Sequence, residues 1–116
     1  MDKLKKKEMT AQYKQTPLPM GVYQIRCLAE PKCYIETAKN LKGKMNGDVF
    51  KLSAGNHVNK GLQTAWNLYG KDRFTVDILE ELKYNPDEPE ADYTEDLEIL
   101  KSIWADKLTG ENLALY

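Results

Sequence analysis

The chain has 116 residues, of which 41% are hydrophobic and 30% are charged, and its formal net charge is −1. This length suits one compact domain with a single core, and the composition excludes a disordered or fibrous chain. The sequence has no run of about 18 apolar residues that could span a membrane, and no apolar stretch follows its lysine-rich start as in a secretory signal. We therefore expect an intracellular, cytoplasmic protein.

The two ends of the chain differ in charge. Residues 1–83 carry 15 basic and 9 acidic side chains, whereas residues 84–116 carry 2 basic and 9 acidic ones. A basic body with an acidic end is compatible with nucleic-acid binding on one face. The near-neutral total argues against the strong nonspecific affinity that many phosphate contacts produce.

The first segment is polar and rich in lysine. It covers residues 1–15, and the TPLP sequence at residues 16–19 then restricts the chain to extended conformations. We expect a basic, flexible tail over residues 1–19 and one folded domain over residues 20–116.

The domain is predicted to begin with a β-hairpin. Residues 22–27 and 33–35 are rich in β-formers, and a Glu-Pro-Lys turn separates them. The two cysteines, Cys27 and Cys33, have a spacing that matches neither a redox CxxC pair nor half of a zinc site. We expect both to be reduced strand residues, with a cross-hairpin disulfide as the less favoured alternative.

Two helices are predicted after the hairpin. Thr37 can cap the first helix, which runs to about Leu52. Gly43 and Gly47 lie inside it and each costs about 1 kcal/mol relative to alanine, so we expect a helix that is bent, short or tightly packed. After a polar break, apolar residues with i, i+3, i+4, i+7 spacing predict a second helix over residues 62–69.

The rest of the chain is predicted to form a strand over residues 74–79, an acidic connection over residues 85–96 and a third helix over residues 97–108. The connection has six acids and no base, and it is either a solvated loop or a docking surface for a basic partner or neighbouring subunit. The order β-β-α-α-β-α predicts an α+β domain in which a three-stranded mixed sheet packs with about three helices.

Four segments of residues 20–116 resemble the GIY-YIG nucleases. The two tripeptides are GVY at residues 21–23 and YIE at residues 34–36. The sequence GNHVNKGLQTAWNLYG, residues 55–70, is similar to the loop and helix of the phage homing-endonuclease branch, and FTVDILEEL, residues 74–82, completes the match. The resemblance implies the small GIY-YIG fold and an origin in a phage or mobile element.

The resemblance also implies a site. In the family, two tyrosines, a helix arginine, a helix glutamate and a late asparagine surround one divalent metal ion and the scissile phosphate. Tyr23 and Tyr34 occupy the tyrosine positions, and Asn112 matches the asparagine. The arginine position falls on Lys44, and the metal-ligand position falls on Lys101.

These replacements change the charge of the expected site. Lys44 keeps a positive charge but loses the planar, two-pronged donor of arginine. Lys101 puts a cation where a carboxylate would hold the metal. Glu36, which replaces the last glycine of the second tripeptide, puts an anion where the phosphate approaches. We therefore expect no cofactor and a loss of catalysis.

Glu36 has three interpretations at this point. It is a solvent-exposed acid that is favourable near a helix N-terminus, or it forms an ion pair with Lys101, with charged atoms within about 4 Å. In the third interpretation, Glu36 and Glu98, which lies one helical turn from Lys101, hold Mg²⁺ or Mn²⁺ in a shifted position.

A group of lysines on and near the first helix is the expected nucleic-acid-binding face, and an ordinary solvated surface is an equal alternative. His57 lies in the G-x-H-x-N loop and could contact a phosphate or a base, but a structural role in the loop is favoured. Trp66 and Trp104 are expected in the core rather than as stacking platforms for bases. The lysines are Lys39, Lys42, Lys44, Lys51 and Lys60.

Three functions are consistent with the sequence. The favoured one is a catalytically inactive GIY-YIG-like protein that binds a protein or nucleic-acid partner, in a regulatory or interference role of a phage or mobile element. The second is a metal-dependent DNA endonuclease with a rearranged site that uses Tyr23, Lys44 and either Glu36 or Glu98. The third is a DNA-binding regulator built on the nuclease surface.

Overall fold

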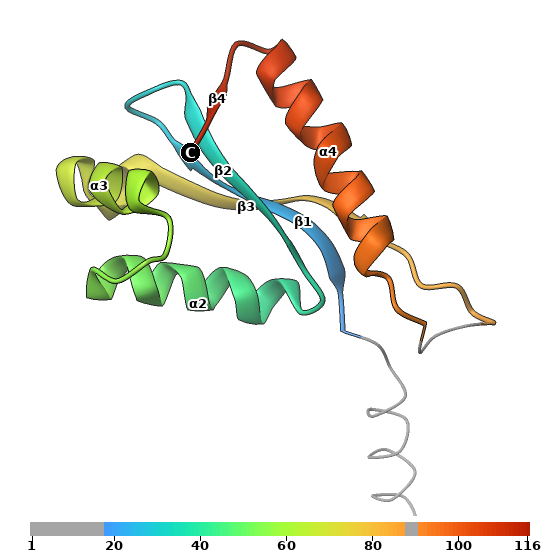
Figure 1. Cartoon of the computed structure of the whole chain (residues 1–116). Coiled ribbons are helices and arrows are strands. Elements are labelled where there is room, and N and C mark those ends of the chain that lie inside the picture. Colours follow the sequence, from blue (N-terminus) through green and yellow to red (C-terminus); the bar gives the residue numbers. More distant parts are fainter. Residues whose placement is uncertain (1–17, 88–90) are drawn as a thin grey trace, which may run out of the picture.

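A computed structural model of the chain describes residues 18–87 and 91–116 (Figure 1). Most of the predicted N-terminal tail, residues 1–17, and part of the acidic connection, residues 88–90, lie outside these residues. Among the residues described, no helix is long and apolar enough to cross a membrane.

A four-stranded mixed sheet forms the centre of the fold, with strand order β3-β1-β2-β4. Strand β1 pairs antiparallel with both β2 and β3, and β4 pairs parallel with β2. The predicted α+β class, mixed sheet and three helices are confirmed, but the sheet has four strands rather than three. The strands are β1 (Met20–Cys27), β2 (Lys32–Ala38), β3 (Phe74–Leu82) and β4 (Ala114–Leu115).

The helices lie on both faces of the sheet (Figure 1). Helices α2 (Leu41–Ala54) and α3 (Lys60–Tyr69) cover one face, and α4 (Thr94–Gly110) covers the other. A short 3-10 turn, η1 (Lys71–Arg73), joins α3 to β3. Side chains of a strand alternate between the two faces, so neighbouring residues of β1 contribute to separate cores.

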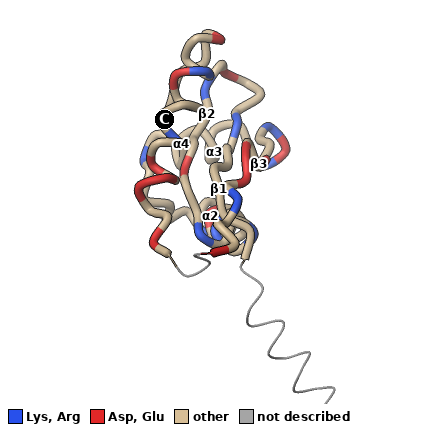
Figure 2. Tube along the Cα trace, turned by 90° about the vertical axis from the view of Figure 1, so that its right-hand side faces the viewer, with Lys and Arg blue, Asp and Glu red and all other residues tan. Residues whose placement is uncertain are grey.

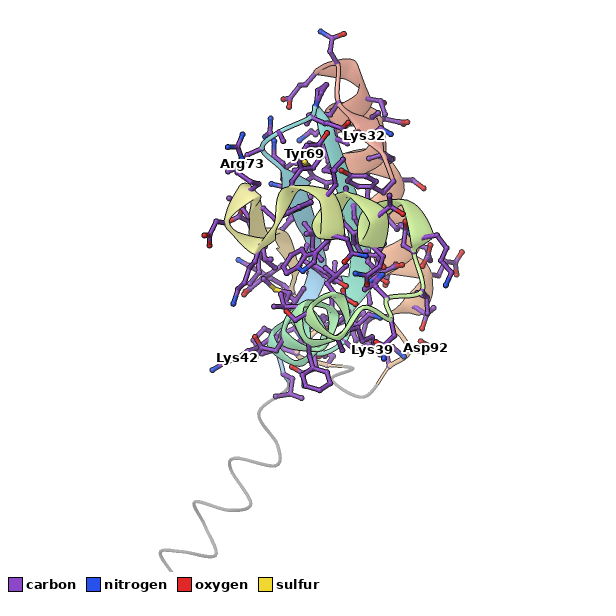
Figure 3. The ribbon with its side chains drawn as sticks, turned by 90° about the vertical axis from the view of Figure 1, so that its left-hand side faces the viewer. Lys32, Lys39, Lys42, Tyr69, Arg73 and Asp92 are labelled. Carbon is purple, nitrogen blue, oxygen red and sulfur yellow. The ribbon has the colours of Figure 1, made fainter. Side chains whose placement is uncertain are left out.

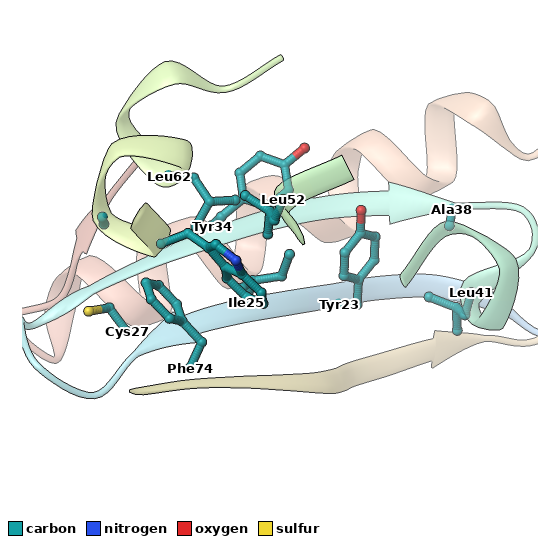
Figure 4. Close-up of a cluster of buried hydrophobic side chains, with 11 residues drawn as sticks. Tyr23, Ile25, Cys27, Tyr34, Ala38, Leu41, Leu52, Leu62 and Phe74 are labelled. Atoms are coloured by element: carbon teal, nitrogen blue, oxygen red, sulfur yellow. The ribbon is translucent and has the colours of Figure 1, made fainter. Parts of the chain in front are cut away.

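The larger core lies under α2 and α3 and contains Tyr23, Ile25 and Tyr34, whose side chains stand on the same side of the sheet (Figure 4). The smaller core lies under α4 and contains Val22 and Cys33. Cys27 belongs to the larger core, so the two cysteines are on opposite faces of the sheet. Both are free, as expected, and this placement excludes a disulfide between them.

The first helix begins later than predicted. Strand β2 continues to Ala38, which pairs with Gly21, so Thr37 cannot cap a helix. Asn40 is the cap, and its Oδ1 accepts a hydrogen bond from the Gly43 N–H at 3.1 Å. A Cβ at position 43 would lie 2.6 Å from Asn40 Nδ2, so the glycine makes room for this cap.

The acidic connection is shorter than predicted, because α4 already begins at Thr94. Asp92 accepts hydrogen bonds from both the backbone N–H and the hydroxyl of Thr94. Glu95 and Asp96 lie in the first helical turn, where acids interact favourably with the helix dipole. Helix α4 therefore uses the last acids of this segment as its N-terminal turn.

The tryptophans differ in burial. Trp66 is buried in the larger core, as predicted. Trp104 is only half-buried against the smaller core, and its Nε1 donates a hydrogen bond to Glu80 at 2.8 Å. Ile103, the residue before Trp104 on α4, is exposed.

Candidate functional site

Tyr34 lies beside a surface hollow of about 310 Å³ where β2, α4 and the start of α3 meet. Tyr34 and Glu36 are two residues apart on β2 and therefore point to the same side of the sheet. Lys101 of α4 and Asn59, the cap of α3, complete the polar part of the lining. We call this region the tyrosine hollow, and it is lined by Tyr34, Ile35, Glu36, Asn59, Lys101, Ala105, Leu115 and Tyr116.

An ion pair crosses the tyrosine hollow. Lys101 Nζ lies 3.2 Å from Glu36 Oε1, and the same oxygen accepts the Thr37 backbone N–H at 2.9 Å. The ion pair predicted from the sequence is confirmed. The interpretation of Glu36 as a solvent-exposed acid at a helix start is wrong, because Glu36 lies within β2 and is only partly exposed. The two side chains are 32% and 29% exposed, so the pair contributes at most about 1 kcal/mol to stability. Its main effect is on the charge of the hollow.

Tyr23 lies opposite Glu36 in the pairing of β1 with β2 and has no exposed surface. Its hydroxyl donates a hydrogen bond to Oδ2 of Asp48, a residue of α2 that is only 3% exposed. A buried carboxylate requires partners, because burying an unpaired charge is very unfavourable. Tyr23 therefore serves as a hydrogen-bond donor to Asp48.

His57 is the second partner of Asp48. Its Nε2 lies 3.1 Å from Asp48 Oδ1, and its Nδ1 accepts the Asn59 backbone N–H at 3.0 Å. Because Nδ1 accepts a hydrogen bond, the ring proton is on Nε2 and is donated to Asp48. The ring edge of His57 also contacts Tyr34, with centroids 5.4 Å apart. The buried network Tyr23–Asp48–His57 thus lies directly against the tyrosine that lines the hollow.

Gln63 of α3 extends this network. Its Oε1 accepts the His57 backbone N–H at 2.9 Å, and its Nε2 donates to the Leu52 carbonyl at 3.0 Å. Every member is a buried polar group with a partner, which is the condition under which such a network stabilises a fold. The loop between α2 and α3 is therefore fixed by polar contacts.

Both tyrosines hold their protons strongly. Burial raises the pKa of Tyr23, and the hydrogen bond to Asp48 raises this pKa further. Burial also raises the pKa of Tyr34, with added effects from the Asp48 and Glu36 carboxylates and an opposing effect from hydrogen bonding with Tyr23. Neither phenol is prepared to act as a base at neutral pH.

The structure does not bring the other two predicted catalytic residues to the tyrosine hollow. Lys44 is exposed and lines a separate hollow of about 530 Å³ with Thr37, Gly43 and Thr94. Asn112 has a left-handed backbone conformation, with φ of 67°. It lines a third hollow, of about 630 Å³, beside β1 and β3.

No protein-family model and no curated protein matches the chain, but its structure is similar to solved structures. One is the catalytic domain of the homing endonuclease I-TevI, with a TM-score of 0.64 and 25% sequence identity over 82% of this chain and 94% of that domain. A point mutant of the same domain gives the same TM-score and identity, over 84% of this chain and 91% of that one. The chain has the GIY-YIG nuclease fold. The resemblance drawn from its sequence segments is therefore confirmed.

GIY-YIG nucleases typically depend on a divalent metal ion, and the side chains here do not fit one. Glu36 is paired with Lys101, and Asp48 is buried between Tyr23 and His57. Over residues 18–87 and 91–116, no three His, Cys, Asp or Glu side chains gather closely enough to hold a metal ion. Glu98, the proposed substitute ligand, is exposed on α4 and has no such group around it.

The five lysines of the predicted nucleic-acid-binding face are all on the surface of the molecule. Lys39 forms an exposed ion pair with Asp92, at 3.5 Å, and Figure 3 shows the two side by side. In the Cα trace of Figure 2, basic residues occur beside α2 and acidic residues occur along α4. We call the lysines the basic face, and they are Lys39, Lys42, Lys44, Lys51 and Lys60.

The structure favours the structural interpretation of His57, which is 1% exposed and has no surface for a phosphate or a base. Its partner Asp48 was missed from the sequence, although a signal exists. Asp48 follows the i, i+4, i+7, i+11 stripe of Leu41, Met45 and Leu52, which faces the core. A carboxylate on such a stripe requires buried donors, and tyrosine and histidine are the candidates that a GIY-YIG site supplies.

Proposed function

We propose that this chain is a GIY-YIG domain that does not cleave nucleic acid and acts by binding a partner. The observation that carries the proposal is the ion pair between Glu36 and Lys101, at 3.2 Å. Lys101 lies at the position that the family uses for its metal-ligand carboxylate, and a cation there opposes metal binding. The carboxylate of Glu36 carries the same charge as a phosphate and therefore opposes its approach to the tyrosine hollow.

The buried network supports the same proposal. A catalytic tyrosine of this fold has to exchange protons with the attacking water or the phosphate. Tyr23 instead keeps its proton and donates a hydrogen bond to Asp48, and both tyrosines have raised pKa values. Lys44, which matches the arginine position, is outside the tyrosine hollow. Loss of one such electrostatic stabiliser costs about 10² to 10³ in rate, and here several changes combine.

Nucleic acid is the partner that the exposed residues favour. The five lysines of the basic face are all exposed, and such a surface attracts phosphates without any need for a metal ion. A protein partner is the alternative, and salt dependence separates the two. Each phosphate contact adds about 0.9 to the slope of log affinity against log salt for duplex DNA.

The first test is a cleavage assay. The purified chain is incubated with supercoiled plasmid in Mg²⁺ or Mn²⁺, and we expect no nicked product. The Tyr23→Phe variant controls for a contaminating nuclease, because a contaminant would cut equally in both preparations. Nicking by the wild-type chain that is lost in Tyr23→Phe would contradict the proposal and favour the rearranged endonuclease.

The second test is a salt titration of DNA binding. The triple variant Lys42→Ala, Lys51→Ala, Lys60→Ala is expected to weaken binding and to reduce the salt slope by about 3. Lys71→Ala, an exposed lysine of η1 outside the basic face, is the matched control and should change the slope by about 1 or less. If the chain does not bind DNA, or if the triple variant has the same salt slope as the wild-type chain, the partner is a protein rather than nucleic acid.

A further inference from the structure

The third hollow lies on the face of the sheet that α4 covers only in part. None of its lining residues lines the tyrosine hollow. Asn112 is the one lining residue that matches a catalytic position of the family. At about 630 Å³ it is within the usual range of small-molecule sites, about 300 to 1,000 Å³. We call it the sheet hollow, and its polar lining includes Gln24, Arg26, Thr75, Asp77, Glu111 and Asn112.

Among the described residues, two side chains of β1 in the lining of the sheet hollow carry a polar or charged group without a hydrogen-bond or ion-pair partner. Gln24 is 8% exposed, and within the described part of the chain its Oε1 is buried without a hydrogen-bond partner. Leaving a buried acceptor unpaired costs about 1 to 3 kcal/mol. The ion pairs of residues 18–87 and 91–116 do not include Arg26, which is half-buried. The lining of the hollow therefore contains a buried acceptor, which a rotation of the Gln24 carboxamide would bring to the hollow, and a half-buried cation outside the ion pairs of the described residues.

The register of the sheet separates acceptors from donors. Gln24 lies opposite Asp77, and Arg26 lies opposite Thr75, in the antiparallel pairing of β1 with β3. Opposite side chains are about 5 Å apart at Cβ, and residues two apart along a strand are about 7 Å apart. The hollow thus has an acceptor end, Gln24 with Asp77, and a donor end, Arg26 with Thr75, about 7 Å from it.

A zwitterion whose ammonium and carboxylate are about 7 Å apart matches the acceptor end and the donor end of the sheet hollow. An extended dipeptide spans about 7 Å, so its ammonium would reach Gln24 and Asp77 while its carboxylate reaches Arg26 and Thr75. Three carboxylates, Glu30, Asp77 and Glu111, line the hollow against one guanidinium. This excess of negative charge disfavours a nucleotide and favours a ligand with a basic side chain.

We propose that the sheet hollow binds a dipeptide, or the equivalent free zwitterionic end groups of a short peptide, with preference for a basic side chain. Gln24 rotates its carboxamide to accept from the ammonium, which pairs the buried oxygen. Arg26 binds the carboxylate through its two-pronged donor. This site is independent of the basic face and of the loss of catalysis proposed above.

Isothermal titration calorimetry with alanyl-lysine tests the site. We expect saturable one-to-one binding that weakens at least tenfold when the peptide is amidated at its C-terminus or acetylated at its N-terminus. Alanyl-glutamate should bind more weakly than alanyl-lysine. Equal binding of the free and capped peptides, or no saturable binding below about 10 mM, equivalent to under 3 kcal/mol of affinity, would overturn the proposal.

Two variants locate the ligand on the full chain. Arg26→Gln is expected to weaken alanyl-lysine at least tenfold while leaving the affinity of the amidated peptide unchanged. Gln24→Leu should weaken binding and leave Tm unchanged or higher, because it removes an unpaired buried acceptor. A fall in Tm for Gln24→Leu, or Arg26→Gln weakening both peptides equally, would assign these residues structural roles and overturn the proposal.

Discussion

Two carboxylates stand near the two tyrosines of this GIY-YIG fold, and burial makes them different. Glu36 is about one-third exposed and pairs with Lys101 across the tyrosine hollow, whereas Asp48 is almost fully buried and bonds Tyr23 and His57. Water screens the first pair, so its contribution to stability is at most about 1 kcal/mol. The buried charge of Asp48 is stabilised by the hydrogen bonds that Tyr23 and His57 donate, so breaking these hydrogen bonds is costly. The partly exposed acid changes the charge of the tyrosine hollow, and the buried acid is the one we expect to matter more for stability.

The largest effect is expected from Asp48→Ala, which leaves the Tyr23 hydroxyl and the His57 Nε2 proton buried without acceptors. Leaving a buried donor without its acceptor typically costs about 1 to 3 kcal/mol, and two donors lose theirs here, out of the roughly 5 to 15 kcal/mol that stabilises a typical domain. Urea unfolding measures the change. The control is Asp106→Ala, an exposed acid of α4, with an expected change below about 0.5 kcal/mol. Equal losses of unfolding free energy in Asp48→Ala and Asp106→Ala would contradict the claim that Asp48 is more important for stability than an exposed acid.

The next effect is a loss of stability at high pH. Tyrosine in an unfolded chain ionises near pH 10, and the raised pKa values of Tyr23 and Tyr34 mean that the folded chain keeps these protons longer. Below about pH 10, the ionisation of these two tyrosines should therefore not affect the free energy of unfolding. Above about pH 10, each tyrosine should lower the free energy of unfolding by about 1.4 kcal/mol per pH unit.

Phenylalanine substitutions test this slope one tyrosine at a time. Tyr23→Phe and Tyr34→Phe should each reduce the slope above pH 10 by about 1.4 kcal/mol per pH unit, measured by urea unfolding at a series of pH values. A slope that stays the same in both variants would show that these phenols ionise in the folded chain as readily as in the unfolded one.

The smallest effect concerns the ion pair of Glu36 and Lys101. A double-mutant cycle with Glu36→Gln and Lys101→Met should give a coupling free energy of about 0 to 1 kcal/mol, which decreases as ionic strength rises. A coupling of several kcal/mol would mean that the pair behaves as a buried one and would remove the contrast with Asp48.

Much of the fold could be predicted from sequence periodicity. The hairpin, α3 and β3 have strong local patterns, and the ion pair followed from placing Glu36 and Lys101 on the GIY-YIG motif. Strand β4 has only two residues and no detectable period, so it depends on pairing with β2 that no local pattern reveals. The cap at Asn40 was missed because Thr37 is an equally good local candidate until the length of β2 is known.

The candidate site was predictable only in part, for a physical reason. Residues that replace positions of the family pattern could be found by comparison with it, and these include Glu36 at the motif glycine and Lys101 at the metal-ligand position. Asp48 replaces no position that the motif marks, and its role depends on burial against Tyr23 and His57, which are 25 and 9 residues away in the sequence. Such contacts are set by the packing of α2 on the sheet, and local sequence patterns do not encode them.

The most direct test of the account is a Mn²⁺ titration followed by electron paramagnetic resonance. The wild-type chain is expected to leave the spectrum of free Mn²⁺ unchanged, because Lys101 and the paired Glu36 do not form a metal site. The double variant Glu36→Gly, Lys101→Glu restores the family residues at both positions and is expected to reduce the free Mn²⁺ signal. A stoichiometric loss of that signal with the wild-type chain would contradict the claim that charge inversion has removed metal-dependent catalysis.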